Sequence, residues 1–378
     1  MTYAAFPLIE ISGPPFERGR AYGRAATERI KRSVRLYTDQ MRGMDFSWHE
    51  VHDIVSQFVP VMRDYAPDLI EEMRGIAAGA DCAFEEIALV NARTEVVQLG
   101  QRRVDARSKD GCTGVIVLPE ASVDGALIHA QNWDWKPECV DSAIVLKVRR
   151  DDGPDLLTFT EAGGLARSGF NAAGLAITAN YLESDRDYCQ VGIPLPLIRR
   201  RVLESAAMAE GIRIVATTPK SASNNMMLSI AAGFGIDFEC APDEAFALYP
   251  DGGILVHANH WMSVPALSKL KETGIDSVPD SYYRDYRVRG YLAPKAGRIT
   301  LDDVKAALFD DFGTPYAICR PPHSERANDI SATVAMLVMQ PGQGTMQVAP
   351  MPAFNRTFTT YTLDLENAAR IGAPQTRR

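Results

Sequence analysis

The hydrophobic period of this chain changes near residue 105, and that change limits the folds open to it. Residues 15–41 and 68–99 carry apolar side chains at helical spacing, so the chain up to residue 105 is predicted to be helical, with a break near Gly79. Beyond it come short runs rich in β-branched and aromatic residues, separated by Gly, Pro and Asp clusters. The first of these runs are predicted to be consecutive antiparallel strands, at 113–119, 126–135, 142–150 and 155–163.

The rest of the chain alternates between the two periods. Thr300, followed by Asp303 at the third position after it, is predicted to cap a helix, and the Pro-Gly-Gln-Gly stretch from Pro341 is predicted to turn a hairpin. Helices, strands, helix, strands, helices and strands in this order predict an α+β protein in which helices cover two sheets. The predicted elements are a strand pair at 166–182, a helix at 194–212, strands at 224–232, 234–242, 244–250 and 252–261, helices at 282–293 and 300–311, and the hairpin at 332–351.

Charge and cysteine spacing exclude several classes of partner. The net charge is −8, and the basic residues are scattered except for the arginines at 199–201, which are predicted to be a solvated helix face, so nucleic acid is not expected as a partner. The six cysteines show no CxxC pair, which argues against a zinc knuckle or a redox motif. No signal peptide and no run of about 20 apolar residues is found. We therefore expect a soluble, cytoplasmic protein with reduced thiols and no membrane partner.

Cys112 follows Asp110 and Gly111 and opens an apolar strand. Asp-Gly is a common turn pair, so an ordinary turn is one interpretation. The other is a chain cut between Gly111 and Cys112, which would free a residue that carries both a nucleophile and a base. An α-amine has a pKa of about 7.7 to 8.0, so near neutral pH it can accept the proton of the thiol. Asp134 in "AQNWDW" lies on one strand face with Asn132, opposite Trp133 and Trp135, where it is either a group that binds the new amine or an exposed acid at the strand end.

Several stretches together are similar to one known family. They are "GPPFERGRAYG", "EEMRGIAAGADCAFEEIALVNAR", "DGCTG", "AQNWDW", "SGFNAAGLAITANYL", "VHANHW" and "SYYRDYRVRGYL". The sequence resembles the acyl-coenzyme A:6-aminopenicillanic acid acyltransferase family, peptidase family C45 of the N-terminal nucleophile hydrolases. The resemblance implies a four-layer αββα sandwich and a zymogen that cuts itself into residues 1–111 and residues 112–378, two chains that stay associated as one domain.

The resemblance also implies roles for single residues. Cys112 would be the processing and catalytic nucleophile, Gly111 the last residue of the released chain, and Asp134 the acid at the Cys112 amine. Asn180 and Asn259 would surround the oxyanion, since an amide NH₂ is a neutral donor to a developing charge. Arg284 would lie near the thiol and favour its thiolate. Ser223 matches a family position, although the sequence around it departs from the family pattern. The candidate pocket residues are Trp133, Trp135, Tyr181 and Ser223.

Two kinds of function fit these residues. The first is a self-processing amidase or acyltransferase that acts on a small-molecule amide or acyl thioester through an acyl thioester on Cys112. The second is a non-processed relative that keeps the fold as a binding or scaffold protein, and the two differ in whether the chain is cut. His257 and His260 form an HxxH, but they are predicted to lie on opposite faces of a strand as structural histidines, without a third ligand. No metal or organic cofactor is expected, and homo-oligomer formation stays open.

Overall fold

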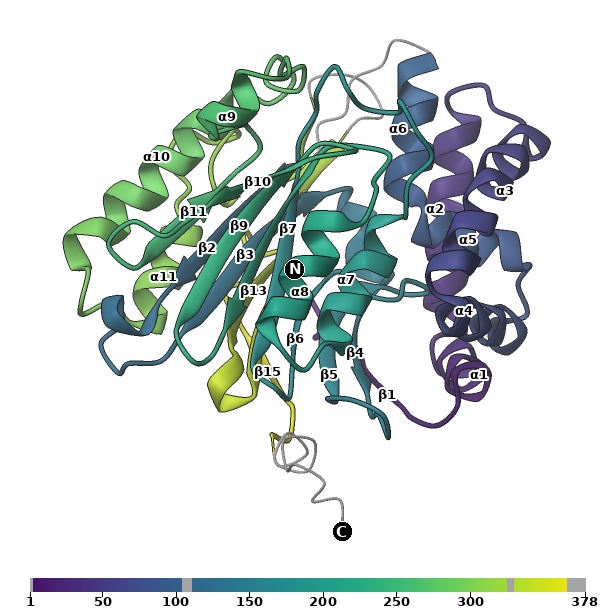
Figure 1. Cartoon of the computed structure of the whole chain (residues 1–378), viewed down its shortest axis with the longest axis horizontal. Coiled ribbons are helices and arrows are strands. Elements are labelled where there is room, and N and C mark those ends of the chain that lie inside the picture. Colours follow the sequence, from purple (N-terminus) through teal and green to yellow (C-terminus); the bar gives the residue numbers. More distant parts are fainter. Residues whose placement is uncertain (1–2, 104–110, 325–329, 366–378) are drawn as a thin grey trace.

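The computed structural model describes residues 3–103, 111–324 and 330–365, and there the chain folds into two stacked sheets with helices outside them (Figure 1). The eight-stranded sheet has the strand order β1 (Leu8–Ile11), β4 (Ala143–Val148), β5 (Leu156–Glu161), β6 (Ser168–Asn171), β7 (Leu175–Tyr181), β8 (Asn224–Ile230), β9 (Phe234–Cys240) and β10 (Ala245–Leu248). The seven-stranded sheet has the order β11 (Ile254–His257), β2 (Gly111–Val117), β3 (Ile128–Trp135), β13 (Ile330–Gln340), β14 (Thr345–Pro350) and β15 (Thr359–Thr362), with β12 (His323–Ser324) paired to β13.

The chain crosses from one sheet to the other directly after β3. Strands β2 and β3 pair with each other, as do β4 and β5, but β3 and β4 belong to different sheets. The prediction of four consecutive paired strands is therefore wrong at this junction, because the short 3-10 helix at Pro137–Asp141 redirects the chain. Neighbouring strands are antiparallel apart from β1 and β4, which are parallel.

The inner faces of the two sheets pack against each other. The ring of Trp133 in β3 lies 5.5 Å from that of Phe159 in β5, in an edge-to-face arrangement. His129 of β3 bridges to Thr178 of β7 and Ser229 of β8, with 2.8 Å between the heavy atoms in each case. The side chains of β2 and β3 that point inward thus face the eight-stranded sheet, and those that point outward face helices.

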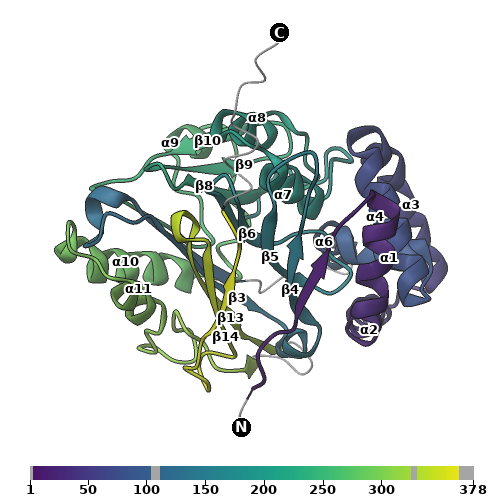
Figure 2. The ribbon, with the colours of Figure 1, turned by 90° about the horizontal axis from the view of Figure 1, so that it is seen from below.

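Helices cover the outer faces of both sheets. Helix α7 (Leu195–Glu204) contacts β6 and β7, and α8 (Met208–Thr217) contacts β8, while α10 (Asp280–Leu292) and α11 (Leu301–Leu308) bury Val288, Leu292 and Leu308 against the seven-stranded sheet. The α+β class and the four-layer αββα sandwich are confirmed. Figure 2 shows the helices before β2 gathered at one side, next to β4 and α7: α1 (Pro15–Ala25), α2 (Thr27–Arg42), α3 (Trp48–Tyr65), α4 (Pro67–Ala80), α5 (Phe84–Asn91) and α6 (Arg93–Arg103).

Several predicted helices are divided in the structure. The stretch 68–99 holds three helices rather than two, with a left-handed residue at Asp81 (φ 55°) ending α4. The predicted helix 194–212 is likewise two, because Ser205 and Ala207 are extended. The capping box at Thr300 and Asp303 and the turn after Gln340 are confirmed. The strands β1, β12 and β15 were not predicted from the sequence.

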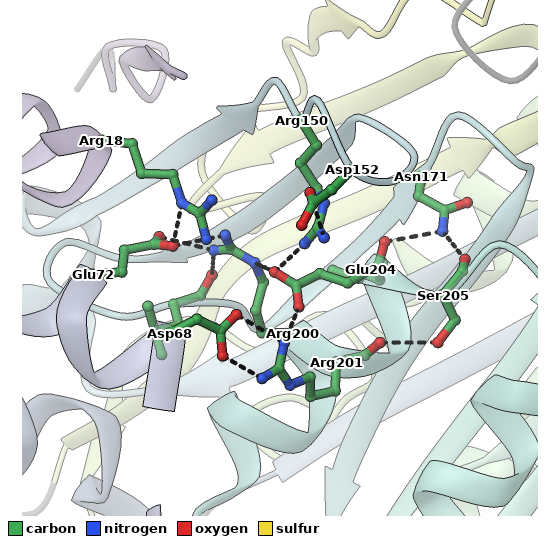
Figure 3. Close-up of polar contacts among 12 residues, drawn as sticks. Arg18, Asp68, Glu72, Arg150, Asp152, Asn171, Arg200, Arg201, Glu204 and Ser205 are labelled. Atoms are coloured by element: carbon green, nitrogen blue, oxygen red, sulfur yellow. Dashed lines mark hydrogen bonds and ion pairs between the residues drawn. The ribbon is translucent and has the colours of Figure 1, made fainter. Parts of the chain in front are cut away.

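The arginines at 199–201 are not a solvated face, which corrects the prediction. Helix α7 is packed between the sheet and the N-terminal helices, so its basic side chains are enclosed. Arg200 is fully buried and donates to Glu72 of α4 at 2.9 and 3.0 Å and to Glu204 at 2.9 Å, while Arg201 pairs with Asp68 and Glu204 (Figure 3). These ion pairs offset the free-energy cost of removing the two guanidinium groups from water. The third, Arg199, is also buried.

Candidate active site

Cys112 lies at the start of β2, which is paired between β11 and β3 in the seven-stranded sheet. It pairs with Trp133 of β3, and its side chain shares the inner face of the sheet with those of Trp133 and Gln131. A Cβ placed on Gly114, the next inward position, would lie 3.6 Å from the amide nitrogen of Asn180 and closer still to Met227 of β8. Cys112 is 1% exposed. The cysteine is thus enclosed between the sheets, at the end of the strand where the chain enters it.

Two buried side chains hold the main chain of Cys112. The Oδ1 atom of Asn259 accepts a hydrogen bond from the Cys112 nitrogen at 2.8 Å. Arg284 of α10 donates to the Cys112 carbonyl oxygen at 2.5 Å, to the Thr113 hydroxyl at 2.9 Å and to Asn259 Oδ1 at 2.9 Å. Asn259 itself is fixed because its backbone nitrogen donates to Ser281 at 2.7 Å. The nitrogen that a cut before Cys112 would free is therefore already positioned.

Asp134 lies beside the residue that precedes the cysteine. It is paired in register with Gly111, and a Cβ on Gly111 would come within 2.9 Å of Asp134 Oδ2. The other oxygen of Asp134 accepts from the Thr333 hydroxyl at 2.7 Å, and Arg320 lies 3.2 Å from Oδ2. A side chain at position 111 would therefore push the Asp134 carboxylate out of its place, and glycine leaves that carboxylate undisturbed. Asp110, the first residue of the predicted turn, lies outside the described residues.

A second carboxylate joins the two arginines. Asp280 accepts from Arg284 at 2.8 Å and from Arg320 at 2.6 Å. Burial alone would raise the pKa of Asp280, but the charges of Arg284 and Arg320 outweigh it and hold that pKa below its ordinary value. Burial raises the pKa of Asp134, and the charges of Arg320 and Arg284 oppose this only in part. The cluster thus holds two cations and two acids against the backbone of β2.

Asp280, Arg320 and Thr333 belong to this cluster but were not predicted from the sequence. Asp280 stands four residues before Arg284, but the predicted helix began only at residue 282, whereas α10 begins at Asp280 and places the two on one face. No local sequence pattern indicates Arg320 or Thr333. Arg320 lies in a loop and Thr333 in β13, and only the fold brings the two to Asp134.

The structure brings together most of the predicted residues. Asn180 lies on β7 across from Gly114, donates to the His257 carbonyl at 2.9 Å and accepts from Gln131 at 2.9 Å. The Nδ2 atom of Asn259 donates to the Tyr181 carbonyl at 2.9 Å. One hydrogen of each amide is thus engaged with a backbone oxygen, and the predicted oxyanion role of both residues stays a prediction.

The four candidate pocket residues lie in different surroundings. The indole of Trp133 is fully buried beneath the Arg167 guanidinium, whose carbon is 4.2 Å from the ring centre. Trp135, on the same face of β3, donates to the Tyr37 hydroxyl at 3.2 Å. Tyr181 hydrogen-bonds to Glu183. Ser223 donates to Asp187 at 2.5 Å and is 2.8 Å from the Ser184 hydroxyl, so it belongs to a polar cluster with these two residues.

The HxxH does not have the predicted geometry. Strand β11 ends at His257, so the period of two does not extend to His260, and the two rings stack with their centres 6.2 Å apart rather than lying on opposite faces. His257 contacts Glu239 at 2.8 Å and lies 3.9 Å from Asp237, while His260 contacts Ser281 at 2.8 Å. Within the described parts of the chain, no group of three or more His, Cys, Asp or Glu side chains is arranged to hold a metal ion.

We expect His257 to make the stability of the protein depend on pH above neutrality. Burial alone would lower the pKa of His257, but the charge of Asp237 and the hydrogen bond to Glu239 raise it from 6.5 to about 9. A raised histidine pKa contributes stability that is complete below pH 6.5 and is lost as the pH rises through 9. Between pH 7 and 9 the Tm should therefore fall by on the order of 3–5 °C, as measured by calorimetry.

Two variants test this origin of the pH dependence. His257→Asn should be less stable at pH 7 and should lose most of the decline up to pH 9. His260→Asn is the matched control, because the pKa of His260 is lowered to about 4, chiefly by burial, and this histidine is neutral across the whole window. An unchanged decline in His257→Asn would show that another group causes it.

The fold defines a class. The αββα sandwich is the fold of the N-terminal nucleophile hydrolase type. The family model described as acyl-coenzyme A:6-aminopenicillanic acid acyl-transferase matches residues 122–350. A relative from Emericella nidulans, the acyl-coenzyme A:6-aminopenicillanic-acid-acyltransferase 40 kDa form, is 30% identical over 316 residues, which are 82% of this chain and 84% of the relative. The chain belongs to the acyl-coenzyme A:6-aminopenicillanic acid acyltransferase family.

Solved structures with a similar chain path include two hydrolases. The conjugated bile acid hydrolase of Clostridium perfringens is 13% identical with a TM-score of 0.47, over 68% of this chain and 94% of that one. The N-acylethanolamine-hydrolyzing acid amidase ortholog of Caenorhabditis elegans is 16% identical with a TM-score of 0.45, over 67% and 100% of the two chains. A search of the described helices for one long and apolar enough to cross a membrane finds none.

Proposed function

We propose that this protein is a self-processing N-terminal cysteine enzyme that cleaves an amide, or transfers an acyl group, through an acyl thioester on Cys112. The observation that carries the proposal is the placement of the Gly111–Cys112 bond. Asn259 holds the nitrogen of this bond, and the Asp134 carboxylate lies beside Gly111 on the other strand. Membership of an acyltransferase family supports the same chemistry.

Processing would use the thiol of Cys112 against the preceding carbonyl. The sulfur adds to the Gly111 carbonyl carbon, the C–N bond breaks, and the nitrogen takes up a proton to become the α-amine of Cys112. Water then hydrolyses the thioester, which gives a carboxylate on Gly111 and a free thiol on Cys112. The cut turns an amide N–H into an amine within reach of Asn259, and Asp134 would bind its charged form.

Turnover would repeat the same chemistry on a substrate. The Cys112 amine accepts the thiol proton, the sulfur attacks the substrate carbonyl, and the remaining amide hydrogens of Asn180 and Asn259 would stabilise the oxyanion. The leaving amine takes the proton from the Cys112 ammonium group as the acyl thioester forms. Water releases the acyl group as an acid, whereas an acceptor amine takes it over in acyl transfer. Arg284 would keep the first strand residues in place through its bonds to Cys112 and Thr113.

The two products of the cut, residues 1–111 and 112–378, would stay associated as one domain. Buried polar contacts join the N-terminal helices to the sandwich. Arg93 of α6 pairs with Glu161 at 2.9 Å, and Asn91 of α5 accepts from the Leu165 nitrogen at 2.9 Å and donates to the Gly163 carbonyl at 2.8 Å. Separating the chains would expose this interface and leave buried charges unpaired, which opposes dissociation.

The test is the intact mass of the freshly purified protein under denaturing conditions. We expect two masses that sum to the precursor plus one water, with the larger fragment starting at Cys112. A single full-length mass that persists after prolonged incubation, together with no acylation of Cys112 by activated amides or thioesters, would favour the other candidate, a non-processed binding or scaffold protein.

A further inference from the structure

Two buried arginines near Cys112 form no ion pair with a carboxylate among the described residues. Arg167, in the loop between β5 and β6, is 7% exposed, and Arg199 of α7 is 5% exposed. Among the described residues, neither guanidinium makes a hydrogen bond or an ion pair with a protein group, and the Nε atom of each is buried without a partner. The next two arginines of α7, in contrast, are paired with Glu72, Glu204 and Asp68 (Figure 3).

The Arg167 guanidinium lies on the inner face of the sheets, the side to which the Cys112 side chain points. The Arg167 guanidinium covers the ring of Trp133, and Trp133 is the direct cross-strand partner of Cys112. Arg199 is close enough to Arg167 and to Cys112 for their charges to interact. Arg167 and Arg199 are therefore the cations near the thiol side of Cys112, whereas Arg284 and Arg320 are tied to the strand backbone and to Asp280.

The nearby acids form no ion pair with either arginine among the described residues. Glu161 pairs with Arg93 and hydrogen-bonds to Tyr37. One oxygen of Glu95 accepts from the Leu195 nitrogen at 2.9 Å, and its Oε2 atom is buried without a hydrogen-bond partner. Burial raises the pKa of Glu95, which weakens it as a counter-charge. Burial, followed by the charges of Arg167 and Arg93, lowers the pKa of Arg199 to about 9. Two buried cations without a direct ion pair cost stability, and an anion placed between them would reduce that cost.

We propose that Arg167 and Arg199 form an anion subsite that binds a carboxylate of the substrate beside the carbonyl that Cys112 attacks. The planar guanidinium forks suit a carboxylate, which can accept two hydrogen bonds from each. This inference rests on the proposed function of Cys112 and narrows its substrate to amides or acyl thioesters with a carboxylate near the scissile bond. The carboxylate can come from the acyl group or from the amine, and both place the same anion between the arginines.

Two thiol reagents that react in the same way but differ in charge test the subsite without turnover. Iodoacetate and iodoacetamide alkylate a thiolate by the same displacement of iodide and differ in one charge. Peptide mass analysis gives, for each cysteine, the ratio of the alkylation rate by iodoacetate to that by iodoacetamide. We expect this ratio at Cys112 to exceed the ratio at the exposed Cys189 of the same molecule by about 10-fold to 100-fold. Arg167→Gln and Arg199→Gln should each lower the ratio, and the double variant should bring it to the Cys189 value.

Stability separates the subsite from a structural role. Arg199→Gln removes an unpaired buried charge, so its Tm should equal or exceed that of the parent, whereas a structural arginine would destabilise on loss. Arg199→Lys keeps the charge and should retain part of the preference for iodoacetate. Arg213→Gln, at an exposed arginine of α8, is the control and should change neither quantity. Equal reagent ratios at Cys112 and Cys189, or no alkylation of Cys112 by either reagent, would overturn the subsite.

Paired substrates then assign the source of the carboxylate. N-phenylacetylglycine carries a carboxylate on the amine side of its amide, and N-phenylacetylethanolamine does not. Glutaric acid monoanilide carries a carboxylate on the acyl side, and valeranilide does not. In one of these pairs, the member with the carboxylate should have a kcat/KM at least about 10-fold higher than its neutral counterpart. Arg199→Gln should abolish this advantage by raising the KM of the charged member. Turnover of the neutral and charged members at equal rates would overturn the subsite and leave the Cys112 mechanism intact. A protein that is never cut and never acylated would instead refute the proposed function.

Discussion

Replacing Cys112 with alanine is expected to give a single uncut chain without amide hydrolysis or acyl transfer. The thiol would be the nucleophile both for the Gly111 carbonyl and for the substrate, so its removal stops the two reactions together. The side chain is small and buried, and alanine leaves the bonds from Asn259 and Arg284 to the backbone of residue 112 in place. Intact mass and turnover of amide and thioester substrates are the measurements.

Two further variants control this experiment. Cys112→Ser should be cut slowly or not at all, because a hydroxyl is a much weaker nucleophile near neutral pH. Cys189→Ala, at the exposed thiol, should be cut and active like the parent. A Cys112→Ala protein that is cut, or that keeps full activity, would refute the mechanism as a whole.

The layers of the fold could be predicted because periodicity is a local property. The change from helical spacing to β-branched runs near residue 105 corresponds to the boundary between α6 and β2. The assignment of strands to sheets could not be predicted in the same way. The residues of β3 and β4 resemble those of a hairpin, and only packing between the two sheets decides that the chain crosses over after Trp135.

The burial of charged side chains was the feature of the site that could least be predicted from the sequence. A run such as 199–201 has the same composition on a solvated helix as on one enclosed by other helices. Arg200 is buried because Glu72 lies 128 residues earlier in the chain, a partner that no local pattern identifies. Arg320 and Thr333 reach Asp134 for similar reasons. Cys112 and Asp134 were singled out from the residues around them, Asn259 and Arg284 were found through the family resemblance, and the geometry brings these four together.

The change Asp134→Asn is expected to slow both processing and turnover by about 100-fold or more while the fold persists. If Asp134 binds the Cys112 amine, the neutral amide removes the charge that orients it. The fold should survive, because an asparagine oxygen can still accept from Thr333, and Arg320 keeps its bond to Asp280 at 2.6 Å. Time courses of chain cutting by intact mass and kcat/KM of the processed fraction are the measurements.

Stability distinguishes this role from a purely structural one. Because the pKa of Asp134 is raised in the folded protein, its ionised form near pH 8 lowers the stability of the fold. The Asn variant, which removes this charge, should therefore keep the parent's Tm within a few degrees. Asp243→Asn makes the same change in an exposed ion pair with Arg186 and should leave cutting, turnover and Tm unaltered. Parental rates of cutting and turnover in Asp134→Asn would show that this acid does not bind the amine. A low Tm with normal kcat/KM in the folded fraction would assign it to the support of β2 and β13 alone.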